Sequence, residues 1–204
     1  MQTLNKSLVK NTFTYTWFIY PVSAILLTLI WLWSFPTFHQ PSAHQKIDAF
    51  FATDVKSTKF ADQIKEKYEP KQLREVNISY ALPANVAVYT EKLKIAITNS
   101  DFLVLPKAQF KSYGVSYPTF FAPITSYIQE KCGVDETSII DGYGIEIKKQ
   151  GEAHYLEQYM TFEEKDYVLA FSVSSKNLGE DGGKDNAEFD NALTFVHYLI
   201  EGQQ

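Results

Sequence analysis

One long uncharged segment near the N-terminus constrains this chain more than any other feature. Residues Tyr15 to Phe35 carry no side chain that is charged at neutral pH. As a helix this segment would extend about 30 Å, the thickness of the hydrocarbon core of a bilayer. Trp17 lies near one end and Trp31 and Trp33 near the other, where aromatic rings favour the headgroup regions. The segment therefore predicts a single transmembrane helix over residues 15–36.

Three interpretations compete for this segment: a retained membrane anchor, a cleaved signal peptide and a buried core helix. A core helix is disfavoured because the segment is apolar on all faces and holds three tryptophans. A signal peptide needs a small residue at position −3 of its cleavage site, and cleavage after Ala43 would place Pro41 there. We therefore expect a retained anchor.

The basic residues around the segment predict its orientation. Lys6 and Lys10 precede it, whereas residues 36–45 contain no lysine or arginine. This pattern predicts a protein of the cell membrane, single-pass, with a cytosolic tail at 1–14, the transmembrane helix at 15–36, a stalk at 37–45 and an extracytoplasmic domain at 46–204. Membrane lipid is the expected partner of the helix.

Charge and cysteine content exclude several classes of function for the region after the segment. Without Lys6 and Lys10 the chain has 17 basic and 24 acidic side chains, a formal charge of −7, so nucleic acid is not expected as a partner. Cys132 is the single cysteine, which excludes an intrachain disulfide, and we expect a buried thiol rather than a reactive one. The four histidines show no metal-ligand spacing, so we expect no metal site and no cofactor.

The first half of the extracytoplasmic region alternates between strand and helix patterns. Strands are predicted at Lys46 to Thr53, Leu73 to Tyr80 and Asp101 to Leu105, with one helix capped by Thr53 and Asp54 and another that starts near Val86. Such a βαβαβ unit builds a parallel sheet through right-handed crossovers. We therefore expect an α/β fold, with one three-layer domain that has a mostly parallel sheet and helices on both faces.

The second half gives weaker patterns. A helix is predicted over Phe121 to Cys132 with Gly133 as its stop, a hairpin from Tyr143 to Phe162, a strand over Asp166 to Ser174 and a closing helix whose capping box is Asp185 and Glu188. The polar loop Gly179 to Asn186 has oxygen ligands that suit calcium, but not in EF-hand order, so a solvated turn is expected there.

Ligands of open α/β sheets bind beyond the carboxyl ends of the strands. Six residues map to that edge and are the candidate ligand-binding residues: Thr53, Asp54, Tyr80, Lys107, Tyr113 and Tyr117. The aromatic members would serve as platforms for a sugar or a peptide. The alternative is that these rings simply pack in the core.

Four segments resemble parts of the extracytoplasmic solute-binding proteins of ABC importers. They are the strand Lys46 to Ala52, the helix after Thr53 and Asp54, the segment Asn99 to Pro106 and the closing helix with Leu193 to Leu199. Those proteins use two lobes and about twice this length, and no lipoprotein cysteine follows the apolar segment here. The resemblance therefore implies one membrane-anchored lobe that acts in binding or as an accessory to a membrane transporter, with an ABC transporter permease as partner.

Two other functions stay open. The first is a membrane-anchored extracytoplasmic hydrolase or transferase whose carboxylates converge only in three dimensions, with Asp54 as a candidate catalytic residue. Two acidic groups within reach of each other in a cleft, one of them buried, would favour this enzyme. The second is an envelope or stress-related structural protein, which would have no concave site.

Overall fold

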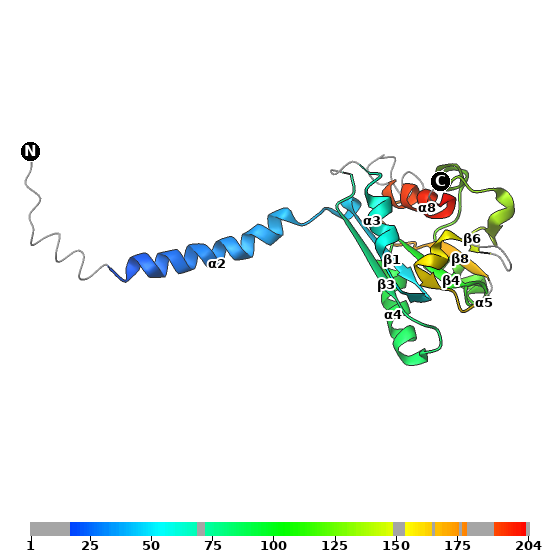
Figure 1. Cartoon of the computed structure of the whole chain (residues 1–204), viewed down its shortest axis with the longest axis horizontal. Helices are drawn as coiled ribbons and strands as arrows, with labels where there is room; N and C mark the ends of the chain where they lie inside the picture. Colours follow the sequence, from blue (N-terminus) through cyan, green and yellow to red (C-terminus); the bar gives the residue numbers. More distant parts are fainter. Residues whose placement is uncertain are drawn as a thin grey trace, which may run out of the picture. The chain divides into compact units, whose positions relative to one another are not determined.

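The computed structural model describes residues 17–68, 72–148, 154–164, 166–175, 177–178 and 190–202. The chain divides into two compact units, Met1–Gln40 and Pro41–Gln204, and each is treated by itself. Figure 1 shows the elements of both units along the sequence.

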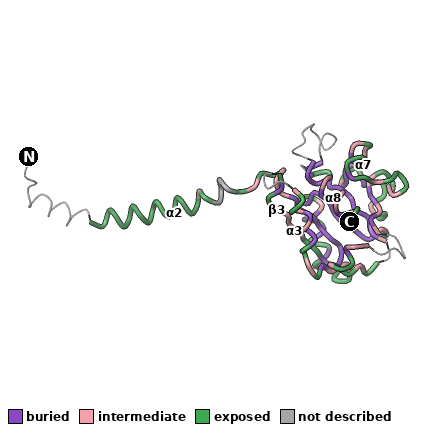
Figure 2. The backbone as a smooth tube through the Cα atoms, turned by 45° about the horizontal axis from the view of Figure 1, so that its top comes forward, coloured by how far each residue is buried: buried purple, intermediate pink, exposed green. Residues whose placement is uncertain are grey.

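The first unit is built around one helix, α2 (Ile19–His39). Its apolar side chains, among them Leu27 and Trp33, are mostly exposed, and Figure 2 shows the helix almost entirely in the colour of exposed residues. Trp31 and Phe35 stack one turn apart, with ring centroids separated by 4.8 Å. A helix therefore forms within the predicted segment, but it runs from Ile19 to His39 and continues past Pro36, where the sequence predicts its end.

The prediction that this helix spans a membrane is corrected. Among the residues that the structure describes, no helix combines the length and the apolar character that crossing a membrane requires.

The second unit contains eight strands and six α-helices within its described residues. The strands are β1 (Lys46–Phe51), β2 (Asp54–Val55), β3 (Glu75–Tyr80), β4 (Phe102–Pro106), β5 (Ile139–Ile140), β6 (Gly144–Lys148), β7 (Met160–Thr161) and β8 (Tyr167–Phe171). The helices are α3 (Lys59–Lys65), α4 (Val86–Asn99), α5 (Lys107–Ser112), α6 (Tyr117–Phe120), α7 (Ser126–Cys132) and α8 (Asn191–Glu201). Short 3-10 helices cover Ala43–Gln45, Gly114–Ser116, Glu136–Ser138 and Tyr155–Gln158.

The main sheet is mixed, which corrects the prediction of a mostly parallel sheet. Its strand order is β3-β1-β4-β8-β6-β5. The βαβαβ unit gives parallel pairs between β1 and both β3 and β4, as predicted. The pairs β4 with β8, β8 with β6 and β6 with β5 are antiparallel. The reason is that β6 follows β5 through a short turn and β8 enters between β4 and β6, without the helical crossovers that parallel pairs need.

Helices cover both faces of this sheet. On one face, alternate residues of β1 and β4, such as Phe51 and Phe102, pack against α3, α7 and α8. On the other face, Phe50 and Leu103 pack against α4, α5 and α6. Because both faces are covered, β4 and β8 are buried along their whole length, which explains their continuous apolar sequences.

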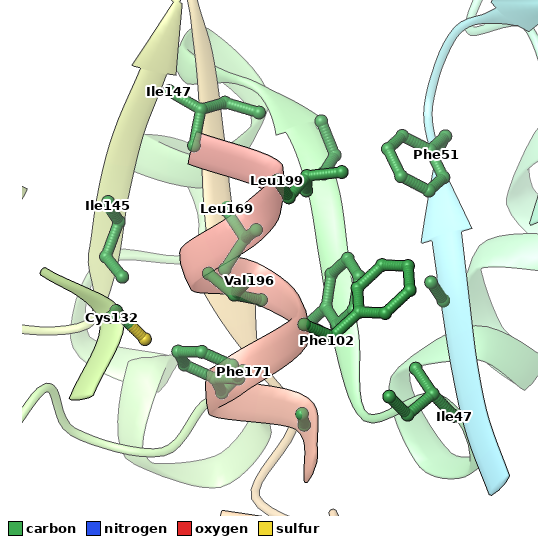
Figure 3. Packing of buried hydrophobic residues seen from close by; sticks show 14 of the residues in the cluster. Ile47, Phe51, Phe102, Cys132, Ile145, Ile147, Leu169, Phe171, Val196 and Leu199 are labelled. Carbon is green, nitrogen blue, oxygen red and sulfur yellow. The ribbon is translucent and has the colours of Figure 1, made fainter. Parts of the chain in front are cut away.

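The closing helix α8 lies across the first of these faces. Figure 3 shows Val196 and Leu199 of α8 directed toward Leu169 and Phe171 of β8, with Cys132 of α7 close by. Gly133 ends α7 in a left-handed conformation with φ of 67°, as the sequence predicts. This packing fixes the end of the described chain against the sheet.

Two local predictions are wrong. Thr53 and Asp54 do not cap a helix, because β2 intervenes and α3 begins after Thr58. The predicted hairpin from Tyr143 to Phe162 does not form, since β6 pairs with β5 and β8 and the residues after it form a 3-10 helix and the short strand β7. The polar loop 179–186 and its capping box lie outside the described residues.

Candidate functional site

The amino ends of β1 and β4 meet the carboxyl ends of α4 and β8 at one edge of the sheet, and a hollow opens there. It encloses about 320 Å³. We call it the first hollow, and its lining is mainly polar: Ala43, Lys46, Asp48, Thr98, Asn99, Ser100, Asp101, Ser174, Ser175 and Asn177. Three separate segments of the chain thus supply one polar surface.

A second hollow of about 510 Å³ adjoins the first, between β3 and α4. The two share Lys46, Asp48, Asn99 and Ser100. The rest of the second hollow is more apolar and is lined by Asn77, Ile78, Ser79, Lys92, Ile95 and Ala96. Together the hollows form a continuous depression on this edge of the domain.

Asp101 organises the first hollow. It is 6% exposed, and its carboxylate accepts hydrogen bonds from the backbone N–H of Asp48 at 2.9 Å, the hydroxyl of Ser175 at 2.7 Å and Nδ2 of Asn177 at 2.9 Å. Its own N–H donates to the carbonyl of Asp48 at 2.7 Å, and its carbonyl accepts from the N–H of Ser172 at 2.9 Å. One buried side chain thus joins β1, β4 and the segment after β8.

The electrostatics of Asp101 follow from this burial. Desolvation raises the pKa of the carboxyl above its usual value, and the negative charge of Asp48 raises it further. The hydrogen bonds from Ser175, Asp48 and Asn177 oppose the rise. The same three hydrogen bonds hold the Asp101 carboxyl in one orientation.

Asp48 is the more accessible of the two acids. Its Oδ1 accepts from Nδ2 of Asn77 at 2.9 Å, and its Oδ2 lies 3.3 Å from Nζ of Lys46. About a third of each side chain in this ion pair is exposed. Asp48 and Lys46 therefore present one negative and one positive group that a ligand in either hollow can reach.

Asn177 contributes a polar atom without a partner. Its Nδ2 donates to the carbonyls of Ala43 and Lys46 as well as to Asp101. Its Oδ1 is buried and has no hydrogen-bond partner in the described part of the chain. A buried acceptor in this state costs about 1–3 kcal/mol, and a ligand that supplies a donor would relieve that cost.

The six residues that the sequence predicts as ligand-binding line neither hollow. Thr53 is fully buried, and its hydroxyl donates to the carbonyl of Thr161. Asp54 lies beside it in β2, in register with Thr161 of β7. These two residues join the small two-stranded sheet to the carboxyl end of β1.

Tyr80 and Lys107 lie at the carboxyl ends of β3 and β4, as predicted, but in different surroundings. Tyr80 is 41% exposed, with the ammonium of Lys92 5.7 Å above its ring. Lys107 forms an ion pair with Glu146 of β6. The structure does not join these two residues in one pocket.

Tyr113 and Tyr117 belong to an aromatic cluster around α5 and α6. Tyr117 is 7% exposed, stacks on Phe110 with ring centroids 4.7 Å apart, and donates from its hydroxyl to Asp141 at 3.0 Å. Burial and Asp141 raise its pKa to about 12. Tyr113 packs edge-on against Phe121 at 5.2 Å. These contacts match the alternative interpretation, in which the rings pack in the core.

The residues of the first hollow did not appear among the sequence candidates. One signal was present: Asp48 and Asp101 are acidic residues inside or beside strands that read as fully buried. A charge at such a position needs compensating partners, so each marks a polar cluster. Ser175 and Asn177 carry no comparable signal, because only the fold brings their segment to the start of β4.

Cys132 and His197 form a structural contact elsewhere in the domain. Burial raises the pKa of the Cys132 thiol to about 12, and Nδ1 of His197 lies 3.2 Å from the carbonyl of Cys132.

Within the described residues, no group of three or more His, Cys, Asp or Glu side chains is arranged to hold a metal ion.

Comparisons with known proteins add nothing to this picture: no family model, no curated protein and no solved structure matches the chain. The geometry of the two hollows is therefore the basis for any functional conclusion.

Proposed function

We propose that residues 41–204 form a non-enzymatic binding domain that takes a small polar ligand, rich in hydroxyl or amine groups, in the first hollow. The observation that carries this proposal is Asn177, whose buried Oδ1 has no partner among the described residues although the side chain lines a polar hollow. Hydroxyl and amine groups of a ligand are the donors that such an acceptor lacks.

The charges in the first hollow support the same ligand class. Asp48 accepts hydrogen bonds and Lys46 donates them, while the hydroxyls of Ser100 and Ser174 can do either. This mixed set suits a neutral polyol or sugar, or a zwitterion, better than a strongly charged ion. The volume of about 320 Å³ lies at the lower end of the range for small-molecule sites.

The openness of the site bears on the expected affinity. The first hollow is formed by one domain edge and continues into the second hollow, so a ligand keeps part of its surface in water. Partial burial limits the free energy of binding, and we expect dissociation constants from about 10 μM to 1 mM, or about −7 to −4 kcal/mol.

Binding of a panel of solutes to the purified full chain tests the proposal. The panel contains monosaccharides, disaccharides, polyols and amino acids, measured by calorimetry and by ligand-observed NMR. We expect at least one class to bind, and the variant Asp48→Ala to weaken that binding at least fivefold. The control Asp62→Asn, on the exposed side of α3, should bind as wild type. Equal affinities for wild type and Asp48→Ala would contradict the proposal.

A second function is favoured by one observation. Asp48 and Asp101 line the same hollow, and Asp101 is buried with a raised pKa, which is the arrangement expected of a carboxylate pair in a hydrolase or transferase. In that case Asp48, the more accessible acid, would contact the substrate. Asp54, the catalytic candidate from the sequence, lies in β2, in register with Thr161 of β7, and does not belong to this carboxylate pair.

Chromogenic glycosides and esters test this enzyme hypothesis. Turnover by the full chain that is lost in both Asp48→Asn and Asp101→Asn would establish it. Turnover that survives either substitution would exclude the pair as catalytic groups.

The predicted location at the cell membrane, the lipid partner and the association with an ABC transporter permease are separate predictions from the sequence. The resemblance to one lobe of a solute-binding protein also stays a prediction. A binding domain of about 160 residues is compatible with such an accessory role, and co-purification with a permease under mild detergent would test it.

A further inference from the structure

The edge strand β3 offers a second kind of binding surface. β3 ends the main sheet beside β1, and no described strand pairs with its outer side. Figure 1 shows β3 and α4 next to each other at this border of the domain. The strand is six residues long and only partly buried. An unpaired edge of this kind can accept another extended chain.

The hydrogen-bond pattern identifies which groups of β3 point outward. The N–H of Ala81, directly after β3, donates to the carbonyl of Phe51 at 3.2 Å. Because successive residues of a strand direct their N–H and C=O to opposite sides, Asn77 and Ser79 also face β1. The main-chain groups of Val76 and Ile78 therefore face away from the sheet.

Tyr80 is consistent with this assignment. Its carbonyl, which the alternation places outward, accepts a hydrogen bond from Nζ of Lys92 at 3.0 Å. No carboxylate of the described residues lies within ion-pair distance of Lys92, so its positive charge stays available next to the strand edge. A carboxylate on an incoming chain would find a partner there.

The second hollow runs alongside the same strand. Its walls are β3 on one side and α4 on the other. On α4, Ile95 is 54% exposed, and Lys92 lies one turn before it. Every second side chain of a strand added to β3 would project toward the α4 side of the sheet, where the hollow is. The hollow thus offers apolar contact to those side chains, which main-chain hydrogen bonds alone do not provide.

We infer that the outer edge of β3 binds an extended peptide that adds to the sheet as a further strand. Its alternate side chains occupy the second hollow, and an acidic group on it pairs with Lys92. This mode uses main-chain hydrogen bonds for affinity and the hollow for selectivity. It goes beyond the proposed function and does not depend on a ligand in the first hollow.

A displayed library of random ten-residue peptides, selected on the immobilised full chain, provides the probe. We expect enriched peptides to alternate apolar residues and to contain at least one Asp or Glu. A synthetic copy of an enriched peptide should bind Ile78→Pro at least tenfold more weakly than wild type, because proline removes an outward N–H without breaking the pairing with β1. The matched variant Ile78→Val keeps that N–H and should bind as wild type.

Amide hydrogen exchange gives a readout that needs no variant. In the free protein we expect the amides of Val76 and Ile78 to exchange faster than those of Asn77 and Ser79. The peptide should slow exchange at Val76 and Ile78 at least tenfold, even if Ile78→Pro fails to fold.

Several results would overturn the inference. These are the absence of enriched peptides, equal affinity for a folded Ile78→Pro, protection at a site other than β3, or an edge that is already occupied by a second copy of the chain. The variant Ser175→Ala, which changes only the first hollow, should leave peptide binding unaltered and so separates this site from the proposed function.

Discussion

Replacing Asp101 with alanine should destabilise the second unit far more than replacing Asp48, although both acids line the first hollow. Asp101→Ala leaves the hydroxyl of Ser175 and the N–H of Asp48 without their acceptor. Each buried donor in that state costs about 1–3 kcal/mol. Removing the buried carboxylate also removes its desolvation cost, which offsets part of this loss of stability. Asn177 keeps its bonds to two backbone carbonyls. We expect a net loss of about 3 kcal/mol.

Asp48→Ala removes a hydrogen bond from Asn77 and a partly exposed ion pair with Lys46. Such contacts contribute about 1 kcal/mol or less. For a domain of this size, a loss of 3 kcal/mol lowers the midpoint of thermal unfolding by about 6–12 °C, against about 2–4 °C for Asp48→Ala.

The assay must report on the second unit. Trp17, Trp31 and Trp33 all lie in the first unit, so tryptophan fluorescence is unsuitable. Eleven of the thirteen tyrosines follow Gln40, so the tyrosine signal in near-ultraviolet circular dichroism, followed against temperature, reports mainly on the second unit. Equal shifts for the two alanine variants, or a larger shift for Asp48→Ala, would refute the assignment of Asp101 as the residue that holds the hollow together.

Four further outcomes follow from named contacts. Because burial raises the pKa of Asp101 in the folded state, the contribution of Asp101 to stability should be greatest below the unfolded pKa of about 4 and fall as pH rises through the folded pKa, and pH-dependent unfolding should show a smaller fall in Asp101→Asn. Gly133→Ala should cost about 1–2 kcal/mol in denaturant unfolding, since φ is 67° and a Cβ would lie 2.9 Å from Nδ1 of His197. Cys132, whose burial raises its pKa to about 12, should not react with a thiol reagent at pH 8 until the domain unfolds, and rapid reaction of the native protein would contradict its placement. Tyr117→Phe should lose about 1 kcal/mol of stability through its hydroxyl bond while leaving solute binding unchanged, whereas weaker solute binding would return this ring to the site.

The sequence predicts the βαβαβ half of the fold well, because its signals are local. The continuous apolar strand around Phe50, the amphipathic helix with Leu93 and the left-handed stop at Gly133 each depend on neighbouring residues. The second half is predicted less well. Strand direction after β4 depends on which strands meet across the sheet, and residues 155–158 bury Leu156 in a 3-10 helix although they alternate like a strand.

The candidate site is harder to predict than the fold. The general rule for parallel sheets directs attention to the carboxyl ends of strands, around Thr53 and Lys107. Here those ends are occupied by the pairing of β2 with β7 and by the ion pair of Lys107 with Glu146. The first hollow lies at the opposite ends of these strands, where β1 and β4 begin. Because β8 runs antiparallel to β4, it brings Ser175 and Asn177 beside Asp101 there. The sequence signals a polar cluster at Asp48 and Asp101, but only the three-dimensional arrangement brings Ser175 and Asn177 to it.

Amide chemical shifts of the isotopically labelled full chain, recorded while the solute panel is added, test the central claim most directly. Binding in the first hollow predicts shifts concentrated at Asp48, Ser100, Asp101, Ser175 and Asn177, with little change at Thr53 or Tyr117. Shifts confined to the carboxyl ends of the strands, or no shifts with any solute at 10 mM (about ten times the weakest dissociation constant expected for a site of this kind), would contradict it.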